Sequence, residues 1–185
     1  MDATDFVLLG LHAMGGEVRG RTKLQKTIYF LGVLTGHLDD LGYRAHYYGP
    51  YSEDVADAVN RLRSVGFVDQ SAAGCGMINR SGFEVCRYDF RLTDDGMQVA
   101  KAKADAEPEF WERLQDAVGA LKKAGDLDYI RLSIAAKTCF MLGKRGKATM
   151  TDLANLAKRF GWKVTSDQVT EGAKYLSSLG LVTLS

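Results

Sequence analysis

The spacing of apolar residues near the start of the chain predicts two helices. Residues 4–14 are strongly apolar, and Gly15-Gly16 ends this helix because glycine makes the helical backbone entropically costly. Thr22 is a good N-cap for a second helix, which is expected to end at Gly36. Apolar residues recur along one face of this second helix, at Leu24, Ile28, Leu31 and Leu34.

An extended segment and a third helix follow. Residues 43–48 are expected to be extended, and Gly49-Pro50 ends them because proline fixes its own φ and disfavours helix in the residue before it. Ser52 is expected to cap the third helix and Gly66 to close it as a C-cap. The buried stripe of this helix comprises Val55, Val59, Leu62 and Val65.

A β-hairpin is expected next. Phe67 and Val68 begin a strand, and residues 75–79 and 83–92 flank the turn-forming sequence Asn79-Arg80-Ser81-Gly82. Three helices followed by a hairpin is the order of elements in a winged helix, a helix-turn-helix variant. The hairpin would be its wing.

The remainder of the chain is expected to be mostly helical. A helix rich in alanine and lysine starts at Thr93, and another runs from Pro108 to Gly125. Further helices over 129–142, 151–160 and 166–179 precede a short strand over 181–184. The predicted fold is mainly α with small β (α+β): a winged-helix-like domain over 1–92, connecting or dimer-type helices over 93–125, and a second helix-turn-helix-like domain over 126–185.

The two ends of the chain share a pattern of residues. Residues 52–68 align without gaps on 166–182, so that a cap, an apolar stripe, a glycine and an edge strand coincide. Upstream, Thr22-Lys23-Leu24 can be matched to Thr151-Asp152-Leu153, and Gly32 to Gly161. The sequence thus predicts one structural unit used twice, with an insertion in the first copy that holds the Tyr43–Tyr51 segment.

Composition indicates a soluble protein with an ordinary hydrophobic core. The chain has 185 residues, 46% of them hydrophobic, which is enough to bury a core without disulfides. With 24 Lys plus Arg and 23 Asp plus Glu, its net charge of +1 gives no global attraction to nucleic acid or acidic membranes. The chain starts with acidic residues and has no long apolar run, so we expect no signal peptide and no transmembrane helix. We therefore expect a cytoplasmic location.

The cysteines are expected to be reduced. Cys75, Cys86 and Cys139 form an odd set without C-x-x-C spacing. If the hairpin turns on Arg80-Ser81, Cys75 and Cys86 face each other, close enough for a bridge or half a metal site. Without further ligands nearby, we interpret them as free thiols.

No catalytic chemistry is apparent. His12, His37 and His46 lack the short spacing of metal ligands, and the cluster Glu53, Asp54 and Asp57 is explained by helix capping and dipole compensation. Phosphate-binding loops, the nucleophile elbow and the zinc-protease motif are missing. We therefore expect a non-enzymatic protein with no catalytic, cofactor-binding or metal-binding residues.

Basic side chains gather at three places that could contact phosphates. In a helix-turn-helix, the start of the second helix lies against the DNA backbone. Against this, the third helix opens with carboxylates, which phosphates would repel. A DNA contact and a solvated basic edge on a protein-binding module both remain open. The residues are Arg19, Arg21, Lys23 and Lys26 at the second helix, Lys144, Arg145 and Lys147 before its counterpart, and Arg80, Arg87 and Arg91 on the wing.

Tyrosines crowd the segment before the third helix. Such a cluster, which includes Tyr48 and Tyr51, could stack bases or receive a peptide, or could simply form a core edge with ordinary surface tyrosines. Tyr29 and Phe30 are available from the preceding helix.

Two motifs carry a family resemblance. The stretch Gly20-Arg21-Thr22-Lys23-Leu24-Gln25-Lys26-Thr27-Ile28-Tyr29-Phe30, followed by Tyr48-Gly49-Pro50-Tyr51-Ser52, resembles small prokaryotic proteins that include the YwgA-like family and the Panacea (SocA-like) antitoxin domain. The resemblance covers roughly residues 20–70. It implies a winged-helix-like regulatory or antitoxin module that acts through protein contacts, and it assigns no catalytic residue.

Our leading hypothesis is a non-enzymatic winged-helix regulator or adaptor whose basic helix mouths and wing contact a partner, with DNA as one possible partner. The alternative is an antitoxin-like module that binds only protein, through the Tyr43–Tyr51 segment. The second half lies outside the resemblance. A homodimer is compatible with both hypotheses.

Overall fold

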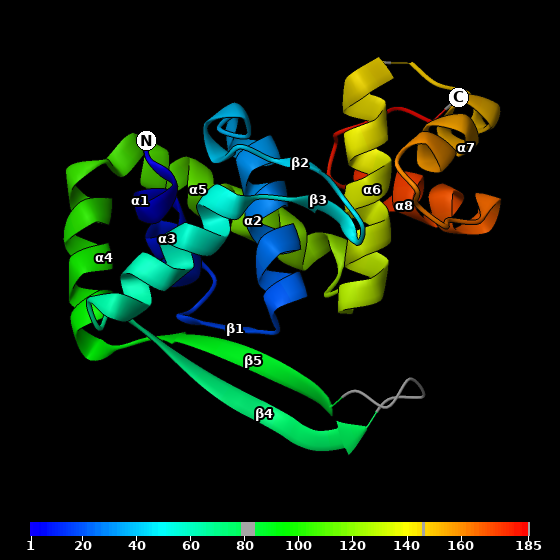
Figure 1. Cartoon of the computed structure of the whole chain (residues 1–185). Helices are drawn as coiled ribbons and strands as arrows, with labels where there is room; N and C mark the ends of the chain where they lie inside the picture. Colours follow the sequence, from blue (N-terminus) through cyan, green and yellow to red (C-terminus); the bar gives the residue numbers. More distant parts are fainter. Residues whose placement is uncertain (79–83, 146, 185) are drawn as a thin grey trace.

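The computed structural model describes residues 1–78, 84–145 and 147–184, and for residues 76–78, 84–85 and 144–145 it describes the backbone alone. The protein is mainly helical with small antiparallel sheets, which confirms the α+β expectation (Figure 1). In chain order its elements are α1 (Ala3–Ala13), β1 (Glu17–Arg19), α2 (Arg21–Thr35), the 3₁₀ helix η1 (Asp39–Leu41), β2 (Arg44–His46), β3 (Gly49–Tyr51), α3 (Glu53–Ser64), β4 (Val68–Ile78), β5 (Glu84–Leu92), α4 (Asp94–Ala106), α5 (Pro108–Ala124), α6 (Tyr129–Arg145), α7 (Met150–Arg159) and α8 (Ser166–Ser178).

Helix starts agree with the sequence at some places and not at others. The Ser52 hydroxyl caps α3 by accepting a hydrogen bond from the Val55 amide at 2.9 Å, as predicted. Thr22 is not a cap: α2 begins at Arg21, and its N-cap is Gly20, two residues before Thr22, with a φ of 95° that glycine adopts readily. The caps of α7 and α8 are Thr149 and Thr165, each in a capping box.

The larger sheet has the strand order β1-β5-β4. The β4–β5 register, with Val68 opposite Leu92, confirms the predicted hairpin, which runs below the helices in Figure 1. The turn expected at Asn79–Gly82, including Arg80, lies outside the described residues. Strand β1 was not predicted; its three residues pair with β5 and place Val18 opposite Phe90.

A second, smaller sheet consists of the hairpin β2–β3. His46 lies opposite Gly49, and Tyr47 and Tyr48 form the turn between them. The expected extended segment is therefore only partly extended. The hairpin reaches toward α6 (Figure 1).

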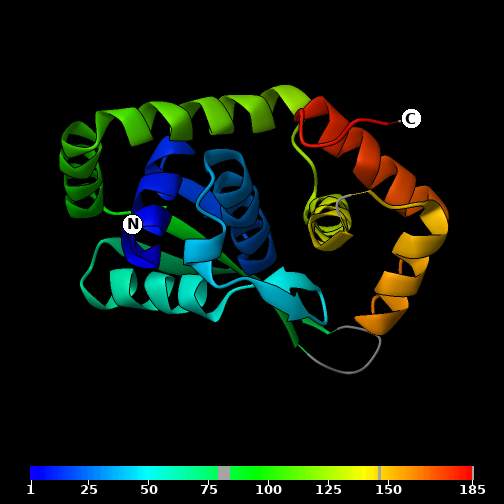
Figure 2. The ribbon, with the colours of Figure 1, turned by 90° about the horizontal axis from the view of Figure 1, so that it is seen from above.

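Three hydrophobic clusters hold the chain together. The first joins α1, α2, α3 and the sheet to α4 and α5, so the apolar stripe of residues 93–125 is covered within the chain. The second packs Tyr29 and Phe30 of α2 against α6 and α8. The third surrounds Met141 and Trp162 among α6, α7 and α8. In Figure 2, α5 runs along the top of the view from the side of α4 and the N-terminus to the side of α8.

The two ends of the chain share their packing and their helix terminators. Helix α1 packs chiefly on α3, and α6 packs chiefly on α8. Gly66 and Gly180 both have positive φ, and the amides that follow them bond to the matched carbonyls of Leu62 and Leu176. The predicted last strand is wrong, because residues 181–184 pair with no strand among the described residues. The cap alignment is wrong by one residue, since Thr165 takes the place expected for Ser166.

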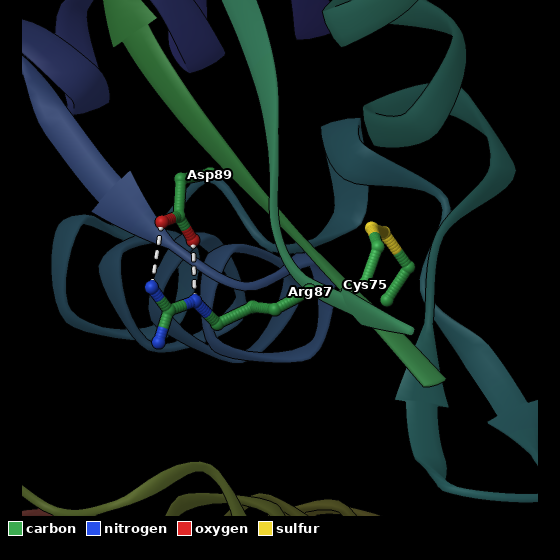
Figure 3. The surroundings of a disulfide bond; sticks show 4 residues. Cys75, Arg87 and Asp89 are labelled. Atoms are coloured by element: carbon green, nitrogen blue, oxygen red, sulfur yellow. Dashed lines mark hydrogen bonds and ion pairs between the residues drawn. A yellow bond between two sulfur atoms is a disulfide. The ribbon is translucent and has the colours of Figure 1, made fainter. Parts of the chain in front are cut away.

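The expectation of free thiols in the wing is also wrong. Cys75 and Cys86 form a disulfide across β4 and β5, with their Cα atoms 4.4 Å apart (Figure 3). Two cysteines facing each other on paired strands are within bonding reach, whatever the total number of cysteines. Cys139 is free.

None of the described helices is both long enough and apolar enough to cross a bilayer.

Candidate functional site

The start of α2 holds the turn before α3 through Gln25. Its side-chain nitrogen donates to the Ser52 carbonyl at 2.8 Å, and its side-chain oxygen accepts from the Ser52 amide at 3.2 Å. The Tyr43 hydroxyl donates to the Gln25 carbonyl at 2.6 Å. The buried side chain of Gln25 thus provides hydrogen-bond partners for the backbone amide and carbonyl of Ser52, which lies just outside strand β3.

Lys26 is buried in the same place, with 2% of its surface exposed. Its Nζ donates to the Pro50 carbonyl at 2.5 Å. Burial, and then the charge of Lys137 on α6, lower the pKa of Lys26 to about 8. Among the described residues no carboxylate is paired with it, so a buried ammonium is held by a carbonyl alone.

Gly49 allows two lysines to enclose the turn. Its φ is 110°, and a Cβ at this position would lie 3.1 Å from Cγ of Lys137 and 3.6 Å from Cε of Lys26. Only glycine combines this backbone conformation with so close an approach.

The C-terminal half holds the other side of the hairpin. The indole nitrogen of Trp162 donates to the His46 carbonyl at 2.6 Å, and the Lys137 ammonium lies 5.8 Å from the Trp162 ring. The hairpin β2–β3 is therefore bound by α2 on one side and by α6 and Trp162 on the other, as Figure 2 shows for the ribbon.

This arrangement leaves two tyrosines in solvent at the hairpin tip. Tyr47 is 70% exposed and Tyr48 is 67% exposed, with their rings in edge-to-face contact at 5.0 Å. The remaining tyrosines of the segment differ: Tyr43 packs edge-on against the buried Tyr29, and Tyr51 contacts the His46 ring. The tyrosine cluster is thus part core edge and part surface.

A pocket of about 300 Å³ opens between α2, α3, the hairpin β2–β3 and the larger sheet. Three of its residues, Arg21, Lys26 and His46, are basic, and none of the described residues that line it is acidic. We call it the cationic pocket. Its lining comprises Arg21, Thr22, Leu24, Gln25, Lys26, His46, Tyr48, Tyr51, Ala56, Val59, Asn60, Gln70 and Phe90.

Three of the basic residues predicted to contact a partner are paired with carboxylates within the chain. Lys23 pairs with Asp126 at 2.6 Å, Arg19 with Glu17 at 2.9 Å, and Arg87 with Asp89 at 2.8 Å. Figure 3 shows the last pair on the hairpin face opposite to the disulfide. These pairs reduce the positive potential at the start of α2 and along the β4–β5 hairpin.

The other predicted basic residues are placed differently. Arg21 is exposed, and its guanidinium lies 4.1 Å from the centre of the Tyr88 ring. Lys26 lies in the interior and contributes to the cationic pocket rather than to the surface. Lys147 is exposed. Arg80 and the side chains of Lys144 and Arg145 lie outside the described residues.

The outward face of α3 begins with negative charge. Glu53, Asp54 and Asp57 are all exposed, on the helix that would read bases in a helix-turn-helix protein. The carboxylates at the start of α3 are thus exposed on the helix surface, as the sequence indicated.

Sequence reasoning missed several residues of the site. Asn60 and Gln70 line the cationic pocket, and Lys137 and Trp162 hold the hairpin. The helical period placed Asn60 on the polar side of α3, but nothing local in the sequence brings Lys137 or Trp162 near Gly49. No three His, Cys, Asp or Glu side chains in the described part of the chain lie close enough to hold a metal ion.

Comparison with known proteins supports the YwgA-like part of the resemblance. No protein-family model matches the chain. The chain is similar to YwgA. This relative, the uncharacterized protein YwgA of Bacillus subtilis (strain 168), is 35% identical over 89 residues, which cover 48% of the chain and 49% of the relative. The chain thus matches about half the length of YwgA.

Proposed function

We propose that the protein is a non-enzymatic regulatory or adaptor module of winged-helix type that acts by binding another protein. The order of α1, α2 and α3 followed by the β4–β5 hairpin supports the winged-helix assignment. An antitoxin activity, which the Panacea-like part of the resemblance implies, is the special case in which the bound protein is a toxin.

The observation that carries this proposal is the exposed pair Tyr47 and Tyr48 on a hairpin held from both sides. Tyrosines at the centre of an interface often supply much of the binding energy. A hairpin already fixed by Lys26 and Trp162 loses little conformational entropy when it binds, so its aromatic tip is preorganised for a partner. We infer that the tip inserts into an apolar pocket of the partner.

The charge distribution favours protein over DNA as the partner. Lys23, Arg19 and Arg87 are paired with carboxylates, and α3 presents Glu53 and Asp57 where a recognition helix would meet phosphates. The net charge of +1 adds no long-range attraction.

DNA binding is the second candidate, and one specific observation favours it. Arg21 is exposed at the start of α2, which lacks a side-chain cap, and the free amides of a helix start can contact a backbone phosphate. In this second model the wing and Lys147 add further phosphate contacts.

Capture experiments with the whole chain test the proposal. The wild-type protein and Tyr47→Ala are used to capture partners from a native lysate of the source cells, with Tyr129→Ala as a matched control because Tyr129 is also exposed, at 58%. We expect a stoichiometric protein partner that Tyr47→Ala loses and Tyr129→Ala keeps. Equal capture by all three proteins contradicts the role of the hairpin tip.

A gel-retardation experiment with random duplex DNA tests the second candidate. Binding at low salt that weakens as salt rises, and that Arg21→Gln reduces, would favour DNA as the partner. Absence of retardation at low salt would remove it.

A further inference from the structure

The cationic pocket has an excess of positive charge that nothing within its walls neutralises. Lys26 is buried there, and among the described residues its ammonium donates a hydrogen bond to the Pro50 carbonyl alone. An ammonium group carries three donors, so it can bond further acceptors. Arg21 also lines the pocket, and the described lining contains no carboxylate. An anionic ligand would reduce the cost of burying this charge.

The first turn of α2 adds a second feature of an anion site. Its N-cap is Gly20, which offers no side-chain oxygen to the first amides of the helix. Arg21 and Thr22, the first residues of this helix, line the pocket. The start of this 15-residue helix, where the helix dipole is positive, therefore borders the pocket. Two basic side chains of the same helix, Arg21 and Lys26, line it as well.

The other walls suit a flat ring rather than a simple ion. Tyr48, Tyr51 and Phe90 are aromatic, and Asn60 and Gln70 supply amide groups that can both donate and accept hydrogen bonds. A volume of about 300 Å³ lies at the lower end of the range for small-molecule pockets and exceeds what a phosphate ion alone requires.

We propose that the cationic pocket binds a phosphorylated small molecule with a planar heterocycle, the class to which nucleoside monophosphates belong. The phosphate lies against the start of α2, near Arg21, Thr22 and Lys26. The ring lies toward Tyr48 and Tyr51, with Asn60 and Gln70 in reach of its edge. Binding is reversible and involves no covalent step. This proposal shares Tyr48 with the proposed protein-binding tip, whereas Tyr47 belongs to the tip alone and does not line the pocket, so Tyr47→Ala separates the two.

A titration of the isotopically labelled full chain, followed by amide NMR shifts, tests it. The probes are AMP, adenosine and inorganic phosphate. We expect AMP to saturate shifts at Thr22, Asn60 and Gln70 and to bind about tenfold or more tightly than either adenosine or phosphate, since neither fragment uses both ends of the pocket. Arg21→Gln and Lys26→Met should each weaken AMP binding by about tenfold.

Lys23→Gln is the matched control. Lys23 lies on the same turn of α2, but its ammonium pairs with Asp126 outside the cationic pocket, so its loss should leave AMP binding within about twofold. Tyr47→Ala should leave it unchanged as well. If Lys26→Met does not fold, Arg21→Gln decides, because Arg21 is a surface residue.

Four results would overturn the proposal. The first two are binding of adenosine or of phosphate as tight as that of AMP. The third is a loss of AMP binding in Lys23→Gln as large as in Arg21→Gln, and the fourth is a set of shifts that stays unsaturated at millimolar AMP.

Discussion

The indole N–H of Trp162 donates to the carbonyl oxygen of His46 at 2.6 Å, which joins the C-terminal helices to the hairpin β2–β3. The two residues are far apart in the sequence, and Trp162 is buried among Met141 and its neighbours. One bond thus links the third hydrophobic cluster to the tip that we propose as a binding surface.

Trp162→Phe should loosen that hairpin. It keeps most of the apolar volume but removes the donor, so the His46 carbonyl loses its partner. We expect a loss of about 1 kcal/mol in the free energy of unfolding and faster amide hydrogen exchange in β2 and β3. Trp111→Phe on α5 is the control, and equal exchange in both variants would show that the indole bond does not restrain the hairpin.

Gly49→Ala should be more damaging than an ordinary glycine substitution. The φ of 110° disfavours alanine, and the new methyl group would press on the Lys137 side chain at 3.1 Å. We expect a loss of about 1–3 kcal/mol in the free energy of unfolding, measured in urea. Gly119→Ala is the matched control: its site on α5 is open, so alanine should be neutral or stabilise by up to about 1 kcal/mol.

Local features of the sequence predicted much of this region. Ser52 is predictable as a cap because its hydroxyl precedes a helical stretch that begins with acidic residues, where it can accept a hydrogen bond from a free backbone amide. Gly66 is predictable as the end of α3 because glycine adopts the positive φ of a helix C-cap. Strand β1 was missed because three residues carry no readable alternation, and pairing with β5 alone makes it a strand. The last strand was predicted from its apolar residues, but a strand needs a partner and 181–184 has none in the described chain.

The site was only partly predictable. Arg21, Lys26, Tyr48 and Tyr51 were selected as basic or aromatic residues, and all four line one pocket. The burial of Lys26 could not be inferred, because helical periodicity does not show that α6 covers the hairpin. Gln70 enters the pocket through its place on β4, which depends on tertiary packing.

Reducing the disulfide should destabilise the protein. Cys75 and Cys86 are 11 residues apart, and a cross-link of that span restricts the unfolded chain by about 3 kcal/mol in the loop-entropy model. We expect dithiothreitol to lower the urea midpoint of the wild type but not of Cys75→Ser/Cys86→Ser. Cys139→Ser should keep the response, since Cys139 is free. Alkylation of all three cysteines in the native, unreduced protein would contradict the bond.

The stability of the protein should rise with pH above about pH 8 because of Lys26. Its pKa is about 8 in the folded state against 10.5 for an unperturbed lysine, so between these values the unfolded chain binds a proton that the folded chain has lost. Deprotonation removes the cost of burying the charge, which is about 3 kcal/mol when complete. Burial also lowers the pKa of Lys137, which acts in the same direction.

Tyrosines limit the pH range in which this effect can be measured. Burial raises the pKa of Tyr29 and Tyr43, so above about pH 10 the unfolded chain loses protons that the folded chain keeps, and stability falls. Urea unfolding between pH 7 and pH 10 should therefore show a rise for the wild type and a much flatter profile for Lys26→Met. Lys23→Met, which removes an exposed ion pair, should keep the wild-type slope. Burial also raises the pKa of the Cys139 thiol, which lowers stability as pH rises in the wild type and in Lys26→Met alike. A wild-type profile with the same slope as that of Lys26→Met would therefore mean that Lys26 is not a buried, carbonyl-bound ammonium.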